Sequence, residues 1–125
     1  MNAGKMPEIY IQIHDLLYSL GITAKYVGYF HTSHAVYLVM QQPDRLLLVT
    51  KWLYPDVAKH YRTDWRNVER SIRTVADIAW KLRPDKLSAI AKYELKRRPS
   101  NSHFIAILAA YCNLRLISLP QIPCP

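Results

Sequence analysis

Residues 54–82, YPDVAKHYRTDWRNVERSIRTVADIAWKL, predict a short helix, a tight turn and a longer helix. Pro55 suits the first turn of the short helix, where its missing N–H costs nothing. Thr63 or Asp64 supplies the N-cap of the longer helix, and Pro84 ends it at Arg83. Apolar residues recur there every three or four positions and predict one buried stripe, made up of Trp65, Val68, Ile72, Val75, Ala79 and Leu82.

The opposite face of the longer helix is basic. It carries Arg66, Asn67, Arg70, Arg73, Thr74 and Asp77. Arginines near the start of one exposed face are typical of a recognition helix, which reads base edges in the major groove. An ordinary solvated surface helix has the same pattern, so the periodicity alone leaves both interpretations open.

Composition limits the class of protein. A chain of 125 residues suits one domain, and with half of its residues apolar it can build a core. Seventeen Lys and Arg against nine Asp and Glu give a net charge of +8, which favours a polyanionic partner: DNA, RNA or an acidic membrane surface. Only three glycines are present, which disfavours β-rich folds and predicts an all-α protein.

The sequence also predicts a cytoplasmic protein without a membrane segment. Its two cysteines imply no disulfide framework, which fits a reducing compartment. No stretch reaches eighteen apolar residues, and the N-terminus lacks the plan of a signal peptide.

The whole chain predicts a compact bundle of about six helices containing a helix-turn-helix, in one domain over residues 1–125. The ordered core is expected from about residue 7 to 116, between a frayed start at 1–6 and an irregular Pro-rich tail from 114 to 125. Pro7 is expected to open the first helix, and Gly21 to end it. Further helices are expected at 29–41, 44–53, about 85–93 and about 102–112. The 44–53 helix should contact the core through Leu46, Leu47, Val49 and Leu53.

The last of these helices is apolar all round. Residues 104–112 are nine apolar residues without a break, which leaves no natural solvent face. Either the domain buries this helix completely or a partner covers one side of it. Because a terminal helix is hard to bury on every side, we expect the partner, in the form of weak association with a second copy. The expected contact residues are Phe104, Ile107, Leu108 and Tyr111.

Other chemistry finds little support in the sequence. His31 and His34 share a face of a predicted helix, but two ligands do not make a metal site, and we expect them at the surface or at a helix start. No phosphate-binding loop, nucleophile elbow or catalytic cysteine signature is present. We therefore expect no enzyme activity, no cofactor, no metal and no small-molecule substrate.

Several motifs agree in order and spacing with a known family. They are GI at 21–22, GY at 28–29, TK-x-LYP at 50–55, YPDVAK at 54–59, VER-x-IR at 68–73, AW at 79–80 and P-x-NS-x-FIA at 99–106. The chain resembles, over roughly residues 9–116, the DNA-binding effector domain of the sporulation initiation response regulators. The resemblance implies a six-helix domain that binds short DNA boxes, with a last helix that joins neighbouring domains on tandem boxes. In the family a phosphorylatable receiver domain precedes this domain, whereas the present sequence begins at the effector domain.

The resemblance also assigns roles to residues. Glu69, Arg70 and Arg73 match family positions that touch DNA, and with Arg66 and Asn67 they form the expected base-contacting set. Asn67 stands where the family has Arg, and because Asn prefers adenine where Arg prefers guanine, the target sequence is not carried over. Apart from the resemblance, the expected phosphate contacts are Lys59, Thr63, Thr74, Lys96, Arg97 and Arg98, although the basic run 96–98 also fits an ordinary solvated loop. Double-stranded DNA is the expected partner, with homodimers that are weak or depend on DNA. The alternative is a receiver-free interaction module that pairs with a full-length regulator.

Overall fold

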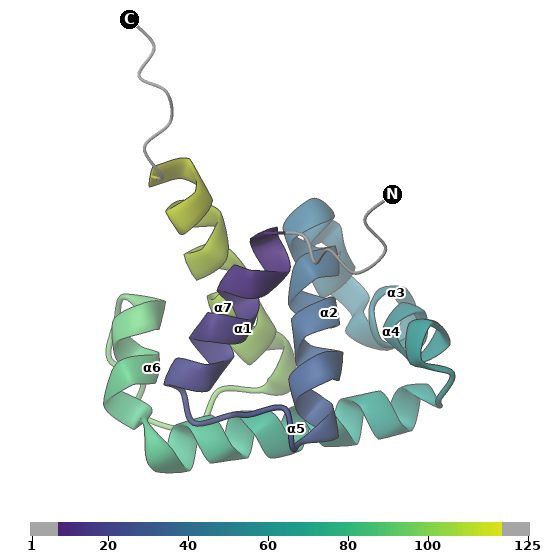
Figure 1. The fold of residues 1–125 in the computed structure, drawn as a ribbon, viewed down its shortest axis with the longest axis horizontal. Helices are drawn as coiled ribbons and strands as arrows, with labels where there is room; N and C mark the ends of the chain where they lie inside the picture. Colours follow the sequence, from purple (N-terminus) through teal and green to yellow (C-terminus); the bar gives the residue numbers. More distant parts are fainter. Residues whose placement is uncertain (1–7, 119–125) are drawn as a thin grey trace, which may run out of the picture.

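The computed structural model describes residues 8–118, and over this range the chain is helical without any strand (Figure 1). The predicted all-α class is therefore confirmed. The elements in order are α1 (Glu8–Ser19), α2 (Val27–Gln41), the 3₁₀ helix η1 (Pro43–Leu48), α3 (Val49–Trp52), α4 (Tyr54–Tyr61), α5 (Trp65–Leu82), α6 (Pro84–Ala91) and α7 (Asn101–Ser118). The expected opening at Pro7, the frayed start and the last residues of the tail lie outside the described range.

α2 is the central helix of the bundle. It packs against α1, α4, α5, α7 and η1, and it contains no charged residue. In Figure 1, α5 runs along one side of the molecule, and α1, α2 and α7 stand on it. α2 reaches α5 at Gly28, where an added Cβ would lie 2.4 Å from Ser71 O and 2.5 Å from Val75 Cγ2. Glycine at position 28 is thus required by this close helix crossing.

α7 is buried far more completely than its place at the end of the sequence predicts. It packs against α1, α2, α5 and α6, and Phe104, Ile107 and Leu108 are at most 6% exposed. The expectation that these three side chains form an association surface is therefore corrected: they belong to the core of the domain. Tyr111, the fourth expected contact, is half-buried. Four neighbouring helices cover α7, so the absence of a polar face reflects burial inside one chain.

The ends of α7 also differ from expectation. The Oγ of Ser100 accepts a hydrogen bond from the His103 N–H at 3.2 Å, which caps the start of the helix. The helix runs to Ser118, so the tail expected to be irregular from residue 114 continues the helix for several residues. No proline occurs after Pro99 until Pro120, so nothing in the sequence stops the helix earlier.

The segment between α2 and α4 is broken, whereas the sequence predicts one helix at 44–53. It forms η1 and the single turn α3. Of the four residues expected in the core, only Leu53 is fully buried. Leu47 is 76% exposed, which corrects its assignment to the core. Pro43 begins η1, and a 3₁₀ helix turns its side chains by a different angle than an α-helix, so the expected α-helical stripe is not maintained.

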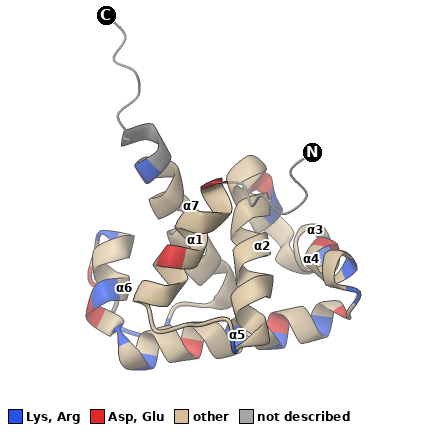
Figure 2. Ribbon diagram, in the orientation of Figure 1, with Lys and Arg blue, Asp and Glu red and all other residues tan. Residues whose placement is uncertain are grey.

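Charged side chains are unevenly distributed over this bundle. Figure 2 shows Lys and Arg interspersed with Asp and Glu along α4, α5 and α6, whereas α1 carries only acidic residues and α2 carries no charged residue. The described helices include none that is both long and apolar enough to cross a bilayer. Residues 54–82, which form α4, the turn and α5, hold six Lys and Arg against four Asp and Glu, a net charge of +2.

Candidate nucleic-acid interface

α4 and α5 form the predicted helix-turn-helix. α4 ends at Tyr61, its C-cap residue Arg62 adopts the left-handed conformation with φ 57°, and the Thr63 N–H donates to Ala58 O at 2.9 Å. Asp64 is the N-cap of α5, because its Oδ1 accepts from the Arg66 N–H at 2.8 Å. Of the two caps that the sequence left open, Asp64 is the one used.

The buried stripe of α5 follows the predicted period and fixes which face is exposed. Val68, Ile72, Val75 and Ala79 are fully buried together with Ala76, and Ser71 is 9% exposed. The two ends of the stripe differ from expectation. Leu82 is 59% exposed, because it lies where the chain turns into α6.

Trp65, at the start of the stripe, is half-buried and packs against the core. The guanidinium of Arg66 lies over its indole ring, 5.0 Å from the centroid. Trp65 therefore does two things at once: it anchors the beginning of α5 and restricts the side chain of Arg66.

The exposed face of α5 carries two rows of interacting side chains. In the first row, Asn67 Nδ2 donates to Thr63 Oγ1 at 3.1 Å, and Arg70 reaches Asn67 Oδ1 only weakly, at 3.5 Å. Thr74 Oγ1 donates back to Arg70 O at 3.2 Å. The guanidinium of Arg70 is thus the least constrained of the arginines on this face.

In the second row, Arg73 Nη2 forms an ion pair with Glu69 Oε2 at 2.5 Å. The two residues are one helical turn apart, so the pair lies flat along the exposed face. It holds both side chains in place and neutralises part of the positive charge there.

A hollow of about 530 Å³ runs beside the first row, between α5 and the start of α2. It is lined by Val27, His31, Tyr61, Thr63, Asn67, Arg70, Ser71 and Thr74. At this hollow, His31 Nδ1 and Ser71 Oγ are hydrogen-bonded at 2.6 Å, which joins α2 to α5. The exposed face of α5 is therefore bordered by a depression and is not a flat surface.

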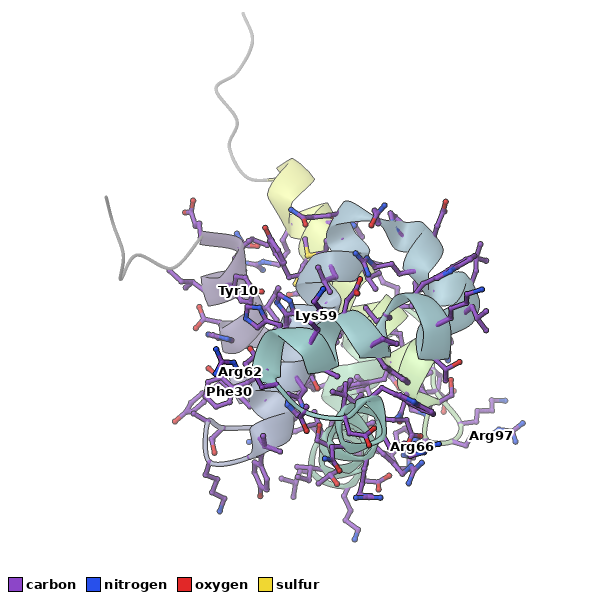
Figure 3. The ribbon with its side chains drawn as sticks, turned by 90° about the vertical axis from the view of Figure 1, so that its right-hand side faces the viewer. Tyr10, Phe30, Lys59, Arg62, Arg66 and Arg97 are labelled. Carbon is purple, nitrogen blue, oxygen red and sulfur yellow. The ribbon has the colours of Figure 1, made fainter. Side chains whose placement is uncertain are left out.

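Basic side chains lie on both flanks of α5. Figure 3 looks along this helix, with Arg62 on one side of it, Arg97 on the other and Lys59 above it on α4. Lys59, Lys96 and Arg97 are exposed, as a phosphate contact requires. Sequence reasoning missed Arg62, which lies in the turn between α4 and α5; its position between the two predicted helices was the available signal.

Three other expected phosphate contacts are engaged within the domain. Thr63 and Thr74 take part in the hydrogen bonds of the first row. Arg98 is half-buried and donates to four acceptors in the protein, which is a correction, since the sequence grouped it with Lys96 and Arg97. A run of three basic residues is thus divided by the fold into two exposed side chains and one internal one.

The histidines are also placed differently than predicted. His31 and His34 are 4% and 9% exposed, not surface residues, because α2 is covered on several sides. His34 Nδ1 is hydrogen-bonded to Tyr10 OH at 2.5 Å, and its ring stacks on His60 at 4.1 Å. Burial, with the nearby charges of His60 and Arg45, lowers the pKa of His34 to about 4. The His31 side chain thus joins α2 to α5, and the His34 side chain joins α2 to α1 and α4.

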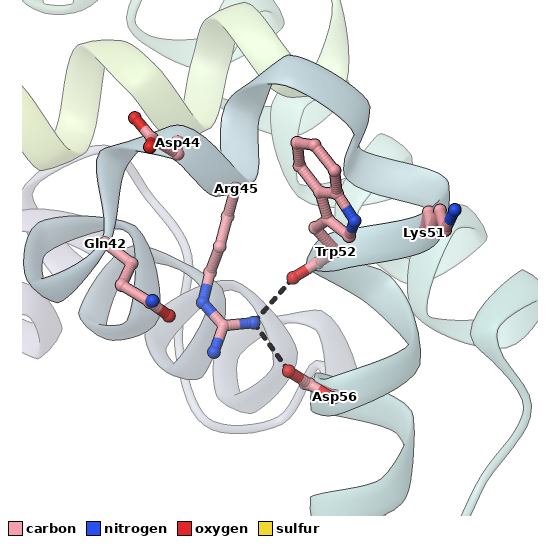
Figure 4. Close-up of a pocket in the computed structure, with 6 residues that line it drawn as sticks. All are labelled: Gln42, Asp44, Arg45, Lys51, Trp52 and Asp56. Carbon is pink, nitrogen blue, oxygen red and sulfur yellow. Dashed lines mark hydrogen bonds and ion pairs between the residues drawn. The ribbon is translucent and has the colours of Figure 1, made fainter.

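A second hollow, of about 380 Å³, lies beside η1 and α3 (Figure 4). It is lined by Gln42, Asp44, Arg45, Lys51, Trp52 and Asp56. Arg45 Nη1 donates to Trp52 O at 2.5 Å and to Asp56 Oδ2 at 2.6 Å, which ties η1 to the start of α4. Two carboxylates and two cations share this hollow, so its charges largely balance.

A family model described as sporulation initiation factor Spo0A C terminal matches residues 13–112. The matched span begins in α1 and ends in α7, and it contains the whole helix-turn-helix.

Proposed function

We propose, from the fact that this chain belongs to the Spo0A C-terminal family of DNA-binding regulatory domains, that it is a transcription regulator which reads a specific duplex sequence with α5. The family is regulatory and not catalytic, and double-stranded DNA is the partner that it implies. The proposed place of action is the cytoplasm.

The observation that carries the proposal is the exposed face at the start of α5. Arg66, Asn67, Glu69, Arg70 and Arg73 all fall within the first nine residues of this 18-residue helix. In helix-turn-helix proteins, this part of the recognition helix contacts base edges in the major groove. Arg70 is the strongest candidate for guanine, because a free guanidinium can donate two bonds to O6 and N7.

The neighbours of Arg70 can add further discrimination. Asn67 offers an amide to adenine, and Glu69 can accept from the amino group of cytosine. Arg73 is held by Glu69, so these two side chains would present a fixed donor and acceptor side by side. Asn67 stands at a position where the family has Arg. We therefore propose a target sequence that differs from the sporulation box at the base pair which this position contacts.

Phosphate contacts would set the register of α5 on the duplex. Arg62 lies on one flank and Arg97 on the other, while Lys59 lies on α4 and Lys96 directly precedes Arg97 in the chain. The two phosphate backbones border the major groove in the same way, on either side of an inserted helix. Thr63 and Thr74 are further candidates through their hydroxyl groups.

Pairing of two copies on DNA remains part of the proposal, through the part of α7 that is still accessible. α6 and α7 border a mainly apolar hollow of about 310 Å³ whose lining includes Tyr93, Ala106, Ala110 and Tyr111. Tyr93 is 51% exposed and Ala110 is exposed. A neighbouring domain on a tandem site would bury this strip, in place of the buried Phe104, Ile107 and Leu108.

The test is selection of bound sequences from random duplex DNA by the purified chain, followed by titration of the selected site. Arg70→Ala should weaken binding by about 1–3 kcal/mol and relax the preference at one base pair. Lys86→Ala on α6 removes one exposed positive charge away from α5 and should have little effect. Absence of any sequence preference in the wild type would contradict the proposal, and absence of DNA binding would favour the interaction-module alternative.

A further inference from the structure

The loop between α6 and α7 is fixed to α5 by one side chain. Arg98 donates from Nη2 to Arg73 O at 3.1 Å, and from Nε to the carboxylate of Asp77. The same guanidinium reaches Asn101 Oδ1 at 3.1 Å and Pro99 O at 2.6 Å. Arg98 therefore connects α5, the loop and the start of α7 through a single planar group.

Asn101 adds a second connection to the same side of α5. Its Nδ2 donates to Glu69 O at 3.0 Å, one helical turn before the carbonyl of Arg73 that Arg98 contacts. The loop is thus fastened to α5 at two successive turns, on the flank occupied by Glu69, Arg73 and Asp77. Pro99, between the two fastening residues, is itself buried.

The two residues before Arg98 are placed in the opposite way. Lys96 and Arg97 are exposed, and within the described residues neither has a hydrogen bond or an ion pair. Figure 3 shows Arg97 pointing away from the molecule, on the flank of α5 opposite to Arg62. Two exposed basic side chains are therefore carried on a loop whose backbone is held at its next residue.

Only arginine suits the position of Arg98. A guanidinium presents five N–H donors in a rigid plane, so it can bind four acceptors from three segments at once. The ammonium of lysine keeps the charge but has three donors on one atom, and it cannot span these acceptors. A group engaged in this way has little capacity left for a phosphate.

We propose that Arg98 is a positioning residue of the DNA interface: it fixes the loop against α5 so that Lys96 and Arg97 bind the phosphates of one strand beside the major groove. Arg98 itself does not touch DNA. This inference rests on the proposed function, since it concerns the second basic flank of the same recognition helix. It also explains why three adjacent basic residues have two different environments.

The test is a double-mutant cycle, read as the dependence of the binding constant on salt concentration. The pair Lys96→Ala and Arg97→Ala should flatten the slope of log K against log salt by about two units, one per lost phosphate contact. Arg98→Ala alone should flatten it by more than one unit, because it releases both contacts. Added to the Lys96 and Arg97 changes, Arg98→Ala should have no further effect.

A direct phosphate contact by Arg98 predicts another result, namely a loss of about one unit in both backgrounds. That result, or an unchanged slope for Arg98→Ala, would overturn the inference. Arg98→Lys separates the two roles even if the alanine variant folds poorly. A phosphate contact tolerates lysine, whereas the fork of bonds to α5 does not, so Arg98→Lys should resemble the loss of Lys96 and Arg97.

Lys86→Ala is the matched control for removal of one positive charge, and thermal melting of each variant checks that the domain is folded at the assay temperature. Arg70→Ala separates this inference from the proposed function. If Arg70→Ala and the wild type bind all sequences equally, the proposed function fails. If Arg70→Ala loses specificity while Arg98→Ala and the Lys96 and Arg97 changes act additively, only the role of Arg98 fails.

Discussion

α5 and α7 are equally long, at 18 residues each, but their sequences distribute polarity in opposite ways. α5 separates an apolar stripe from a charged face, and the structure buries that stripe as predicted apart from its ends. α7 is apolar on every side from residue 104 to 112, and the structure surrounds it with four helices. Both pack against α2. The sequence of an amphipathic helix therefore predicts which face is buried, whereas the burial of a uniformly apolar helix depends on the rest of the chain.

Shortening a buried side chain of α7 should have the largest effect on stability. Phe104 is fully buried, so Phe104→Ala should lower the free energy of unfolding by about 3–5 kcal/mol. Urea unfolding followed by circular dichroism measures this difference. His103→Ala, at the exposed neighbouring position, is the control and should change stability by less than about 0.5 kcal/mol. Equal effects of the two changes would place α7 at the surface.

Acid should lower the stability of the fold through His34 of α2, the helix against which both α5 and α7 pack. The pKa of His34 is lowered from 6.5 to about 4 in the folded chain, so the unfolded chain binds this proton more readily. The stabilising contribution of neutral His34 is complete above pH 6.5 and is lost as pH falls toward 4, for a total of about 3 kcal/mol.

Unfolding measured at several pH values between 7 and 4 tests this prediction. His34→Gln stays neutral throughout and can still bond to the hydroxyl of Tyr10, so its stability should depend less on pH. Burial also lowers the pKa of His31, which adds to the acid sensitivity that remains in the variant. A variant with the same pH dependence as the wild type would exclude His34 as the cause.

Trp65 tests the boundary between the two faces of α5. Because its ring is only half-buried, Trp65→Ala should cost about 2 kcal/mol, less than a fully buried aromatic residue. The change also removes the ring under Arg66, so DNA binding should weaken as well. Arg66→Ala is the control and should weaken DNA binding while it leaves the melting temperature nearly unchanged. Normal melting of Trp65→Ala would mean that the ring belongs to the DNA face.

Ala110 should give the smallest change in stability. It is exposed on α7, so Ala110→Glu should alter the free energy of unfolding by less than about 0.5 kcal/mol. If copies pair on DNA through this strip, the variant should bind a single site normally and lose cooperativity on a duplex with two sites. Titration of one-site and two-site duplexes measures this. Independent filling of two sites by the wild type would remove the pairing proposal.

The sequence by itself determined the all-α class, the helix-turn-helix and the orientation of α5. These features depend on residues close together in the chain: Pro55 in the first turn of α4, the cap before α5, and an apolar period of three to four residues. An amphipathic helix carries the information about its two faces in its own sequence, because each face repeats with the helical turn.

The tertiary structure alone decided which apolar and charged residues are inside. It buried Phe104, Ile107 and Leu108 of α7 and left Ala110 exposed, it exposed Leu47 and covered His31 and His34, and it engaged Arg98 within the domain while Lys96 and Arg97 stayed in solvent. Arg98 contacts Asp77, 21 residues earlier, and Asn101 contacts Glu69, 32 residues earlier. The spacing of apolar residues along one helix does not predict such contacts. They depend on neighbouring segments that only the folded chain brings together.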